Sequence, residues 1–299
     1  MDPSQRPSSS EDSRPVPPGN PDEGLLSPEM GHRSAGMGVA SGKQVNIATE
    51  SARIAGPGTA LESRRYKLRE DLRGLIAGDV HIDEFTLLQY ASDASIFQVL
   101  PLGVVRPQGH DDVVAIARYC SQNGITMIPR GAGSGLAGEC LGAGLVIDFS
   151  HSMCGITAVG RDTVTVQPGV VLADLNRHLQ RYGQMLGPDP SNRGFSTVGG
   201  SVARDAAGSH WPAAGSFAQH VLQARVVLAN GDTVELGGLA TDRNNENRSA
   251  KLLLQGQVAT CLQRYPDLMT PDSTALAAGY RFQELSLEGE IDLLPLMVG

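Results

Sequence analysis

The segment that most constrains the fold of this chain is residues 125–138, where an apolar run leads into a turn rich in glycine. Residues 125–128 have the composition of a buried strand, and four glycines follow within the eight residues 131–138. Glycine has no Cβ to hold a ligand away from the backbone and it permits φ > 0, so successive N–H groups in such a turn can point into one concavity that suits phosphate. Arg130, at the start of the turn, adds a guanidinium group with five donors for phosphate oxygens.

The glycines of residues 133–138 also have the G-x-G-x-x-G spacing of a dinucleotide-binding fingerprint, but their context differs. In a Rossmann domain this fingerprint opens a helix whose N-terminus holds the pyrophosphate. Here Gly142 and Gly144 would interrupt any helix, and residues 145–149 predict another strand. The turn therefore joins strand to strand. This disfavours a NAD-binding Rossmann domain and leaves a glycine-rich turn without any ligand as the alternative.

A second glycine-rich segment, residues 187–208, lies further along the chain. Pro188 and Pro190 stiffen its approach, and Gly199 and Gly200 again allow close contact between backbone and ligand. Taken alone, the segment predicts a pair of surface loops. Two such loops flanked by apolar strands predict one extended ligand that lies across both.

Hydrophobic periodicity predicts an α+β fold with a small parallel layer in β-α-β order. Glycine at positions 124 and 183 marks the ends of two helices, and Asn230-Gly231 between apolar runs is a strong hairpin signal. The predicted elements are a helix with Leu68, Leu72, Leu75 and Ile76 on one face, a strand at 103–106, a helix at 111–122, strands at 125–128, 145–149 and 163–167, a helix at 171–182, a hairpin at 224–236 and a final strand at 293–299.

Composition excludes several classes of function. The net charge of -8 argues against nucleic acid or an anionic membrane as a partner. No apolar run approaches the roughly 20 residues that a membrane span needs. The four cysteines form no C-x-x-C pair and the seven histidines are scattered, so no metal site is predicted. The cysteine pattern suits a reducing cytoplasm, and a length of 299 residues predicts one or two domains.

The first part of the chain differs from the rest. Residues 1–60 are rich in Pro, Ser and Gly with little periodic hydrophobicity, and such a segment cannot offset its own ordering entropy. We therefore predict a disordered tail at 1–60, a helical lead-in at 61–98 and one domain at 99–299.

Several motifs follow one another in a fixed order, and together they resemble a known family. They are residues 129–138, 145–150, 164–170, 188–191, 197–200 and 226–232. In this order they resemble the FAD-binding domain of the vanillyl-alcohol oxidase / p-cresol methylhydroxylase (PCMH) type, and the branch of D-lactate dehydrogenase and glycolate oxidase flavoproteins is the most similar. The resemblance covers about residues 90–299 and implies a small parallel βαβ subdomain beside a larger mixed or antiparallel subdomain.

The resemblance also implies the cofactor and its ligands. Members that attach FAD covalently through this loop carry a histidine where this chain has Ser134, so non-covalent FAD is expected. The expected cofactor-binding residues are Arg130, Gly131, Ala132, Gly133, Ser134, Gly135, Leu136, Pro188, Asp189, Ser191, Thr197, Gly199, Gly200, Ala207, Gly208 and Val227.

The chain departs from the resembled family at positions near the flavin. Many members carry two asparagines where Arg204 and Asp205 stand, and a tyrosine where Ala214 stands, so altered tuning of the flavin is expected. In the family, the apolar run at 293–299 continues into a stretch that closes the FAD domain, and a substrate-binding cap domain follows. We therefore expect this sequence to be a fragment or a truncated reading frame.

Two functions of different class follow from these observations. In the first, the chain is the flavin half of an oxidoreductase that acts on a 2-hydroxy acid such as D-lactate or glycolate. In the second, it is a non-catalytic or degenerate flavin binder that needs a partner chain to supply the cap. No catalytic residue can be named in either case, because the family places the base and the substrate clamp in the cap.

Overall fold

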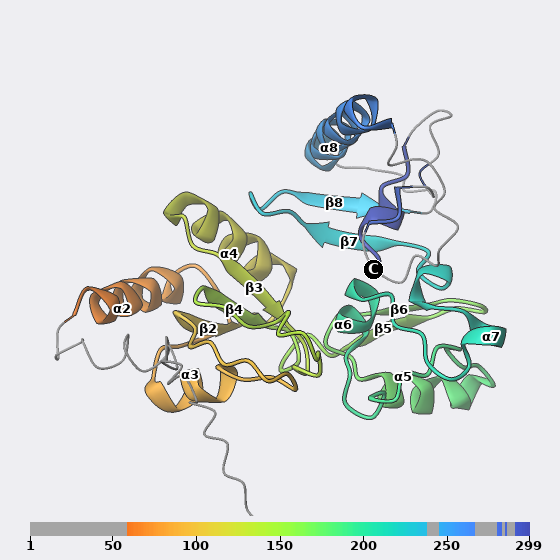
Figure 1. Cartoon of the computed structure of the whole chain (residues 1–299), viewed down its shortest axis with the longest axis horizontal. Coiled ribbons are helices and arrows are strands. Elements are labelled where there is room, and N and C mark those ends of the chain that lie inside the picture. Colours follow the sequence, from red (N-terminus) through yellow and green to blue (C-terminus); the bar gives the residue numbers. More distant parts are fainter. Residues whose placement is uncertain (1–58, 238–244, 267–279, 283–284, 286–290) are drawn as a thin grey trace, which may run out of the picture. The chain divides into compact units, whose positions relative to one another are not determined.

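A four-stranded sheet organises the first part of the computed structural model, which describes residues 59–237, 245–266, 280–282, 285 and 291–299 (Figure 1). Its strands are β1 (Asp79–His81), β2 (Gly103–Arg106), β3 (Met127–Arg130) and β4 (Leu145–Asp148), in the spatial order β1-β2-β4-β3. β4 pairs in parallel with both β2 and β3, and β1 is antiparallel to β2. The predicted parallel layer is therefore present, with β4 inserted between the two strands that precede it in sequence.

Helices cover both faces of this sheet. They are α2 (Ala60–Arg73), α3 (Glu84–Tyr90) and α4 (His110–Asn123). Leu68 and Leu72 of α2 share a buried core with Ile116 of α4 and with one face of the strands, while Leu87 of α3 packs with Val104 on the other face. Parallel strands buried on both faces are apolar along their whole length, which is why they were recognisable as continuous apolar runs.

Two predicted boundaries in this part are wrong. α2 ends at Arg73 with Gly74 as its C-cap, so Leu75 and Ile76 lie beyond the helix, and the side chain of Leu75 is 56% exposed. The strand predicted at 125–128 is β3 at 127–130, because α4 extends to Asn123 and the N–H of Ile125 donates to Cys120 O in the helix end. Gly124 allows the helix to end in this way, because it adopts the left-handed C-cap conformation (φ 60°) that glycine favours.

The second part of the structure joins a hairpin to short helices. Its elements are β5 (Ile156–Val159), β6 (Val164–Val166), α5 (Leu172–Leu179), a 3-10 turn (Gln180–Tyr182), α6 (Val198–Ala203) and α7 (Trp211–Ala214). Leu175 and Leu179 of α5 are buried with Val170 against the hairpin. α5 ends at Leu179, and Gly183 (φ 69°), predicted as the helix end, ends the 3-10 turn that continues from it. The second glycine-rich segment is not made of loops alone, because Thr197 caps α6 and the residues that follow it form the first turn of this helix.

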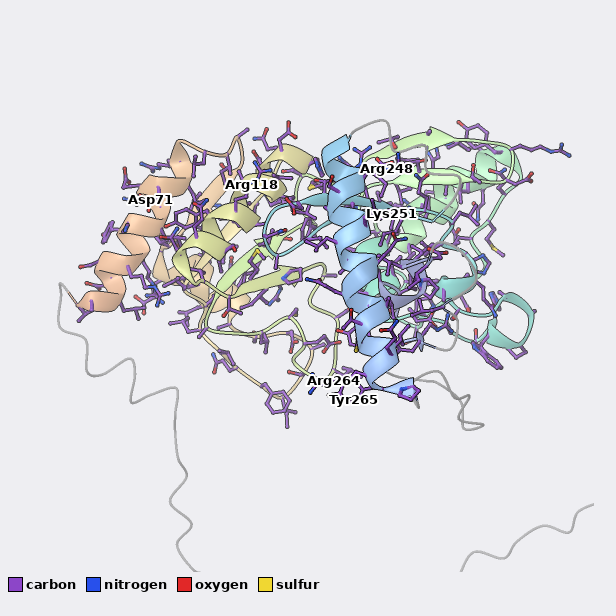
Figure 2. The ribbon with its side chains drawn as sticks, turned by 90° about the horizontal axis from the view of Figure 1, so that it is seen from above. Asp71, Arg118, Arg248, Lys251, Arg264 and Tyr265 are labelled. Atoms are coloured by element: carbon purple, nitrogen blue, oxygen red, sulfur yellow. The ribbon has the colours of Figure 1, made fainter. Side chains whose placement is uncertain are left out.

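A third group of elements surrounds the last hairpin. β7 (Ala224–Val227) and β8 (Thr233–Leu236) are antiparallel, as the Asn230-Gly231 signal predicts. The long helix α8 (Asn245–Arg264) packs on β8, and Figure 2 shows Arg264 and Tyr265 at its C-terminal end. The strand predicted at 293–299 is wrong. Its buried residues are held by a 3-10 turn (Leu294–Leu296), which accommodates Pro295 where a strand ladder would lose an N–H donor.

The fold class is confirmed as α+β, with one mixed four-stranded sheet that has a parallel core and two antiparallel hairpins in the described residues. The tail predicted to be disordered lies outside the described residues, except for its last two positions. Within the described part, no helix has both the length and the apolar character needed to cross a bilayer.

Candidate functional site

The first glycine-rich segment is the connection between β3 and β4. Gly133 (φ 65°) and Gly138 (φ 76°) adopt the left-handed conformation that favours glycine. The carbonyl of Gly133 accepts the N–H of Ala94 at 3.0 Å, and a Cβ on Gly138 would lie 2.9 Å from the ring of Phe97. The segment that follows α3, through Ala94 and Phe97, therefore packs against the turn and stabilises it.

Arg130 stabilises the same turn. Its guanidinium donates to the carbonyls of Tyr90 at 3.1 Å and Ser92 at 2.8 Å and lies 5.1 Å from the centroid of the Tyr90 ring. A Cβ on Gly133 would lie 2.6 Å from the terminal nitrogen of Arg130. The arginine predicted to face phosphate thus uses two of its N–H groups to tie the 90–92 segment to the turn, and its contact with phosphate stays a prediction.

A buried polar network supports the carboxyl ends of β2 and β4 beside this turn. The carboxylate of Asp148 accepts hydrogen bonds from the hydroxyl of Tyr90 and from both the N–H and the hydroxyl of Ser150. Arg106 donates to the Tyr90 hydroxyl at 3.1 Å, and burial is the main cause that raises the pKa of Tyr90. A satisfied network of this kind fixes the strand ends from which the glycine-rich turn begins.

Cys140 lies two residues after Gly138, the last glycine of the turn. Its thiol is buried and donates to the carboxylate of Asp93 at 3.4 Å. Burial raises the pKa of Cys140 to about 11. Although burial acts to raise it, hydrogen bonds from Ser95 and Cys140 hold the pKa of Asp93 below its usual value. The charged form of Asp93 is therefore stabilised next to the glycine-rich turn.

The second glycine-rich segment contains α6 and the loop before it. Gly199 donates to Pro168 O at 2.8 Å, and a Cβ there would lie 2.7 Å from the Pro168 side chain. Gly200 donates to the hydroxyl of Thr197, the N-cap of α6. Glycine at 199 is thus required by close packing of the backbone on residue 168, which its sequence context did not reveal.

The structure brings the two glycine-rich segments together. The amide of Asn192 donates to the hydroxyl of Ser134 at 3.0 Å. Gly131 approaches Thr197 so closely that a Cβ on Gly131 would overlap the threonine hydroxyl. The two segments are therefore in contact, and their binding of one shared ligand stays a prediction.

A third stretch of predicted residues is held by Asp189. Its carboxylate accepts the N–H of His210 at 2.8 Å and the hydroxyl of Ser209 at 2.7 Å, and these hydrogen bonds lower its pKa. Gly208 (φ 124°) packs against the backbone of Asp189, where a Cβ would overlap it. Pro188 is buried, while Ser191 is exposed.

A cavity of about 630 Å³ lies beside this stretch. Asp189 and His210 line it together with Arg177, Arg193 and Gln180, so its wall carries both charge signs. The volume is within the range of small-molecule pockets.

The remaining predicted residues lie as follows. Ala132 and Leu136 are exposed on the first turn, and the side chain of Leu136 is 75% exposed. Ala207 is partly buried in the loop between α6 and α7. Val227 lies on β7, paired with Thr233, and belongs to the last hairpin instead of either glycine-rich segment.

Sequence reasoning missed two polar contacts of the site. Glu139 forms an ion pair with Arg204 at 3.5 Å between Oε1 and Nε, which links the first turn to the residue after α6. Asp205 has the one positive φ (45°) among the described non-glycine residues, and it accepts the N–H of Ala218 and pairs with Arg281 at 3.2 Å. A glutamate within a glycine-rich turn was the available signal for the first contact.

The geometry fits a diphosphate. Gly133 and Gly135 add no side chain to the turn. A Cβ on Gly133 would meet the anchored guanidinium of Arg130, and a Cβ on Gly135 would meet the carboxylate at the end of the flexible Glu139 side chain. Backbone N–H groups and guanidinium groups are the donors that phosphate oxygens prefer. No group of three or more His, Cys, Asp or Glu side chains suited to a metal ion occurs among the residues described.

Comparisons with known proteins agree with this geometry. Residues 101–237 match the family model described as FAD binding domain. The D-2-hydroxyglutarate dehydrogenase of Escherichia coli (strain K12) is 34% identical over 163 residues, which cover 53% of this chain and 16% of that protein. The glycolate oxidase subunit GlcD of Bacillus subtilis (strain 168) is 36% identical over 161 residues, which cover 52% of this chain and 34% of that protein.

A solved structure shows the same fold. An alkyldihydroxyacetonephosphate synthase aligns with a TM-score of 0.52 at 23% identity, over 60% of this chain and 35% of that chain. The predicted family resemblance and the prediction of FAD as cofactor are confirmed by these matches. The chain spans about a sixth to a third of the length of these two curated relatives.

Proposed function

We propose that this chain binds FAD without a covalent link and is the flavin part of an oxidoreductase that acts on a 2-hydroxy acid. The match of residues 101–237 to the FAD binding domain model supports this proposal. The two curated relatives support the substrate class, because their names are those of a 2-hydroxyglutarate dehydrogenase and a glycolate oxidase subunit. The free thiols of all four cysteines support a cytoplasmic location, as the sequence suggested.

The observation that carries the proposal is the meeting of the two glycine-rich segments. Gly131 lies against Thr197, and the hydroxyl of Ser134 accepts a hydrogen bond from Asn192, so the first turn is in direct contact with the second segment. We propose that the diphosphate of FAD lies along this junction, held by backbone N–H groups and by guanidinium groups. Charge-assisted hydrogen bonds contribute about 1.5–3 kcal/mol each, so a few of them are sufficient in a chain of net charge -8.

The non-covalent link rests on Ser134. A serine hydroxyl cannot form the bond that a histidine at this position forms in the covalent members of the resembled family. In this structure the Ser134 hydroxyl accepts a hydrogen bond from Asn192, so it joins the two segments instead.

When bound, FAD supplies the redox chemistry of hydride removal from the substrate, and the protein supplies orientation and electrostatics. The residues of this chain bind the cofactor, keep the turn rigid through Arg130 and Asp148, and exclude water by the packing of Gly131 on Thr197. We propose that a partner chain or a further domain supplies the catalytic base and the group that binds the substrate carboxylate.

The contacts of the polar residues after α6 favour a second function, that of a non-catalytic flavin binder. Asp205 accepts the N–H of Ala218 and pairs with Arg281, so its carboxylate is not poised as a free base, and the guanidinium of Arg204 is a cation that has no free lone pair to accept a proton. These commitments favour a non-catalytic flavin binder if the chain acts alone.

The test is to purify the full chain and precipitate it with acid. FAD should appear in the supernatant, and FAD at about 100 times its dissociation constant should stabilise the fold by about 2.7 kcal/mol. Flavin retained in the pellet would contradict the non-covalent link, and a colourless protein that FAD does not stabilise would contradict binding. Little turnover of D-lactate or glycolate with an artificial electron acceptor is expected from the chain alone. Robust turnover would contradict the need for a partner.

A further inference from the structure

An ion pair crosses the mouth of the first glycine-rich turn. Oε1 of Glu139 lies 3.5 Å from Nε of Arg204, and the two side chains are 37% and 54% exposed. Glu139 belongs to the turn between β3 and β4, whereas Arg204 directly follows α6 in the second segment. The pair is therefore a charged connection between the same two segments that the proposed cofactor site requires.

The carboxylate of Glu139 covers the glycine backbone. A Cβ on Gly135 would overlap both carboxylate oxygens, and one of these oxygens accepts the N–H of Ala137 at 3.0 Å. A carboxylate is an anion with two acceptor oxygens, so it satisfies donors in this turn much as a phosphate would. Glu139 thus occupies part of the surface expected to receive an anion.

Arg204 is the cation of this turn that is free to change partner. Arg130 is anchored by two backbone carbonyls and by the Tyr90 ring, so moving it would release the 90–92 segment. Arg204 has a flexible side chain with more than half its surface exposed, and its contact is a single ion pair. Exposed pairs of this kind change an equilibrium constant by less than about tenfold, so an incoming anion with more charge can displace the carboxylate.

We propose that Glu139 and Arg204 form an exchangeable latch, in which the Arg204 guanidinium pairs with Glu139 in the cofactor-free chain and transfers to the FAD diphosphate on binding. This inference rests on the proposed function, because it assigns a role to residues beside the same turn. A diphosphate carries two negative charges and matches the fork of a guanidinium, which makes it a better partner than one exposed carboxylate. Glu139 has to leave, since two anions over Gly135 would repel each other.

The latch predicts that affinity depends on the phosphate part of the ligand and not on the flavin ring. The test is to titrate the full chain with FAD, with ADP and with riboflavin at several salt concentrations. ADP carries the diphosphate without the flavin, and riboflavin carries the flavin without phosphate. Four single variants are compared with the unchanged chain, namely Glu139→Gln, Arg204→Gln and, as matched controls, Arg161→Gln and Asp162→Asn. The control residues form an ion pair at 3.8 Å with side chains 96% and 85% exposed, between β5 and β6.

The expected results have opposite signs for the two partners. Glu139→Gln should tighten FAD and ADP by about threefold to tenfold, because the competing and repelling charge is removed. Arg204→Gln should weaken both by roughly tenfold to hundredfold and should flatten the salt dependence. Riboflavin binding and the two control variants should change by less than about twofold. The gain from Glu139→Gln should shrink when Arg204 is already Gln.

Three outcomes would overturn the latch. Unchanged or weaker FAD binding in Glu139→Gln would show that the carboxylate does not compete with the cofactor. Unchanged FAD affinity in Arg204→Gln would show that the guanidinium does not reach the diphosphate. In both cases a chain that still binds FAD leaves the proposed function intact, whereas failure of the unchanged chain to bind FAD overturns the proposed function and the latch together.

Discussion

Replacing Gly131 by alanine tests whether the two glycine-rich segments are in contact. Gly131 is not one of the glycines with positive φ, so alanine is compatible with its backbone. Its Cβ would overlap Oγ1 of Thr197 and lie 3.3 Å and 3.4 Å from the threonine Cβ and Cγ2. Thr197 is 3% exposed and cannot move into solvent without opening the junction.

The magnitude follows from the contacts that are lost. Overpacking by one methyl group costs about 1–3 kcal/mol in the free energy of unfolding. Displacing the Thr197 hydroxyl also removes its hydrogen bond to the N–H of Gly200, and loss of an N-cap costs about 0.5–2 kcal/mol. Against this, alanine restricts the unfolded chain and stabilises the fold by about 0.4–1 kcal/mol.

A double variant separates the clash from the other contributions. Thr197→Ala alone should cost about 1 kcal/mol through loss of the cap. In Gly131→Ala/Thr197→Ala the hydroxyl that the new methyl group would strike is absent, while the effect on the unfolded chain is the same as in the single variant. The double variant should therefore be more stable than the sum of the single variants predicts, by about 1–2 kcal/mol.

The assay is equilibrium urea unfolding followed by circular dichroism, with FAD titration of the same four proteins. Gly131→Ala should weaken FAD binding, and Thr197→Ala in the same chain should restore part of it. Additive stabilities within about 0.5 kcal/mol, or a Gly131→Ala protein as stable as the unchanged chain, would refute the close approach of residues 131 and 197.

Two further predictions concern the same turn. Gly133→Ala should weaken FAD binding far more than Gly183→Ala. Both variants strain a left-handed residue, but only the Cβ at 133, 2.6 Å from Arg130, displaces a side chain, and nothing lies within 4 Å of a Cβ at 183. Equal FAD affinities of the two variants in a fluorescence titration would argue against the turn as the site. Alkylation by iodoacetamide, followed by peptide mass spectrometry, should label the exposed Cys154 before the buried Cys140 at mildly alkaline pH. The alkylation rate of Cys140 should keep rising as the pH approaches about 11, because burial raises the pKa of Cys140 to that value and the thiolate is the reactive form. Early labelling of Cys140 would contradict its buried state.

The parts of the fold that the sequence predicted are those with local signals. Apolar runs marked β2 and β4, glycines at 124 and 183 marked the helix ends, and Asn230-Gly231 marked the last hairpin. Each signal acts within a few residues, so no knowledge of the tertiary partner was needed. The limits predicted at 1–60, 61–98 and 99–299 depend on composition and stay predictions.

The elements that the sequence did not predict depend on distant partners. β1 has only three residues, and its strand character comes from pairing with β2. α6 begins with two glycines within its first three residues, which have low helix propensity, and it forms because Thr197 caps it and Gly199 packs on Pro168. Tertiary contacts override local preference in both cases.

The candidate site shows the same division. The glycines of the turn were recognisable because their spacing is local, whereas the carbonyls that hold Arg130 come from Tyr90 and Ser92, about 40 residues earlier. The sequence therefore identified Arg130 as a cation beside the turn, but it did not identify the two carbonyls to which Arg130 donates. The pairing of Glu139 with Arg204 was equally hidden, because 65 positions separate the two residues.

These contacts explain how a chain of net charge -8 can hold a dianionic cofactor. A general positive field is absent from its composition, so attraction has to come from groups at the turn itself. Arg130 is committed to the backbone, which leaves the N–H groups of the glycine-rich turn as fixed donors and Arg204 as an exchangeable one. Fixed donors act only if the turn keeps its shape, and that shape depends on Gly131 meeting Thr197. Affinity for FAD should therefore respond more strongly to one methyl group at position 131 than to removal of an exposed charge elsewhere on the surface.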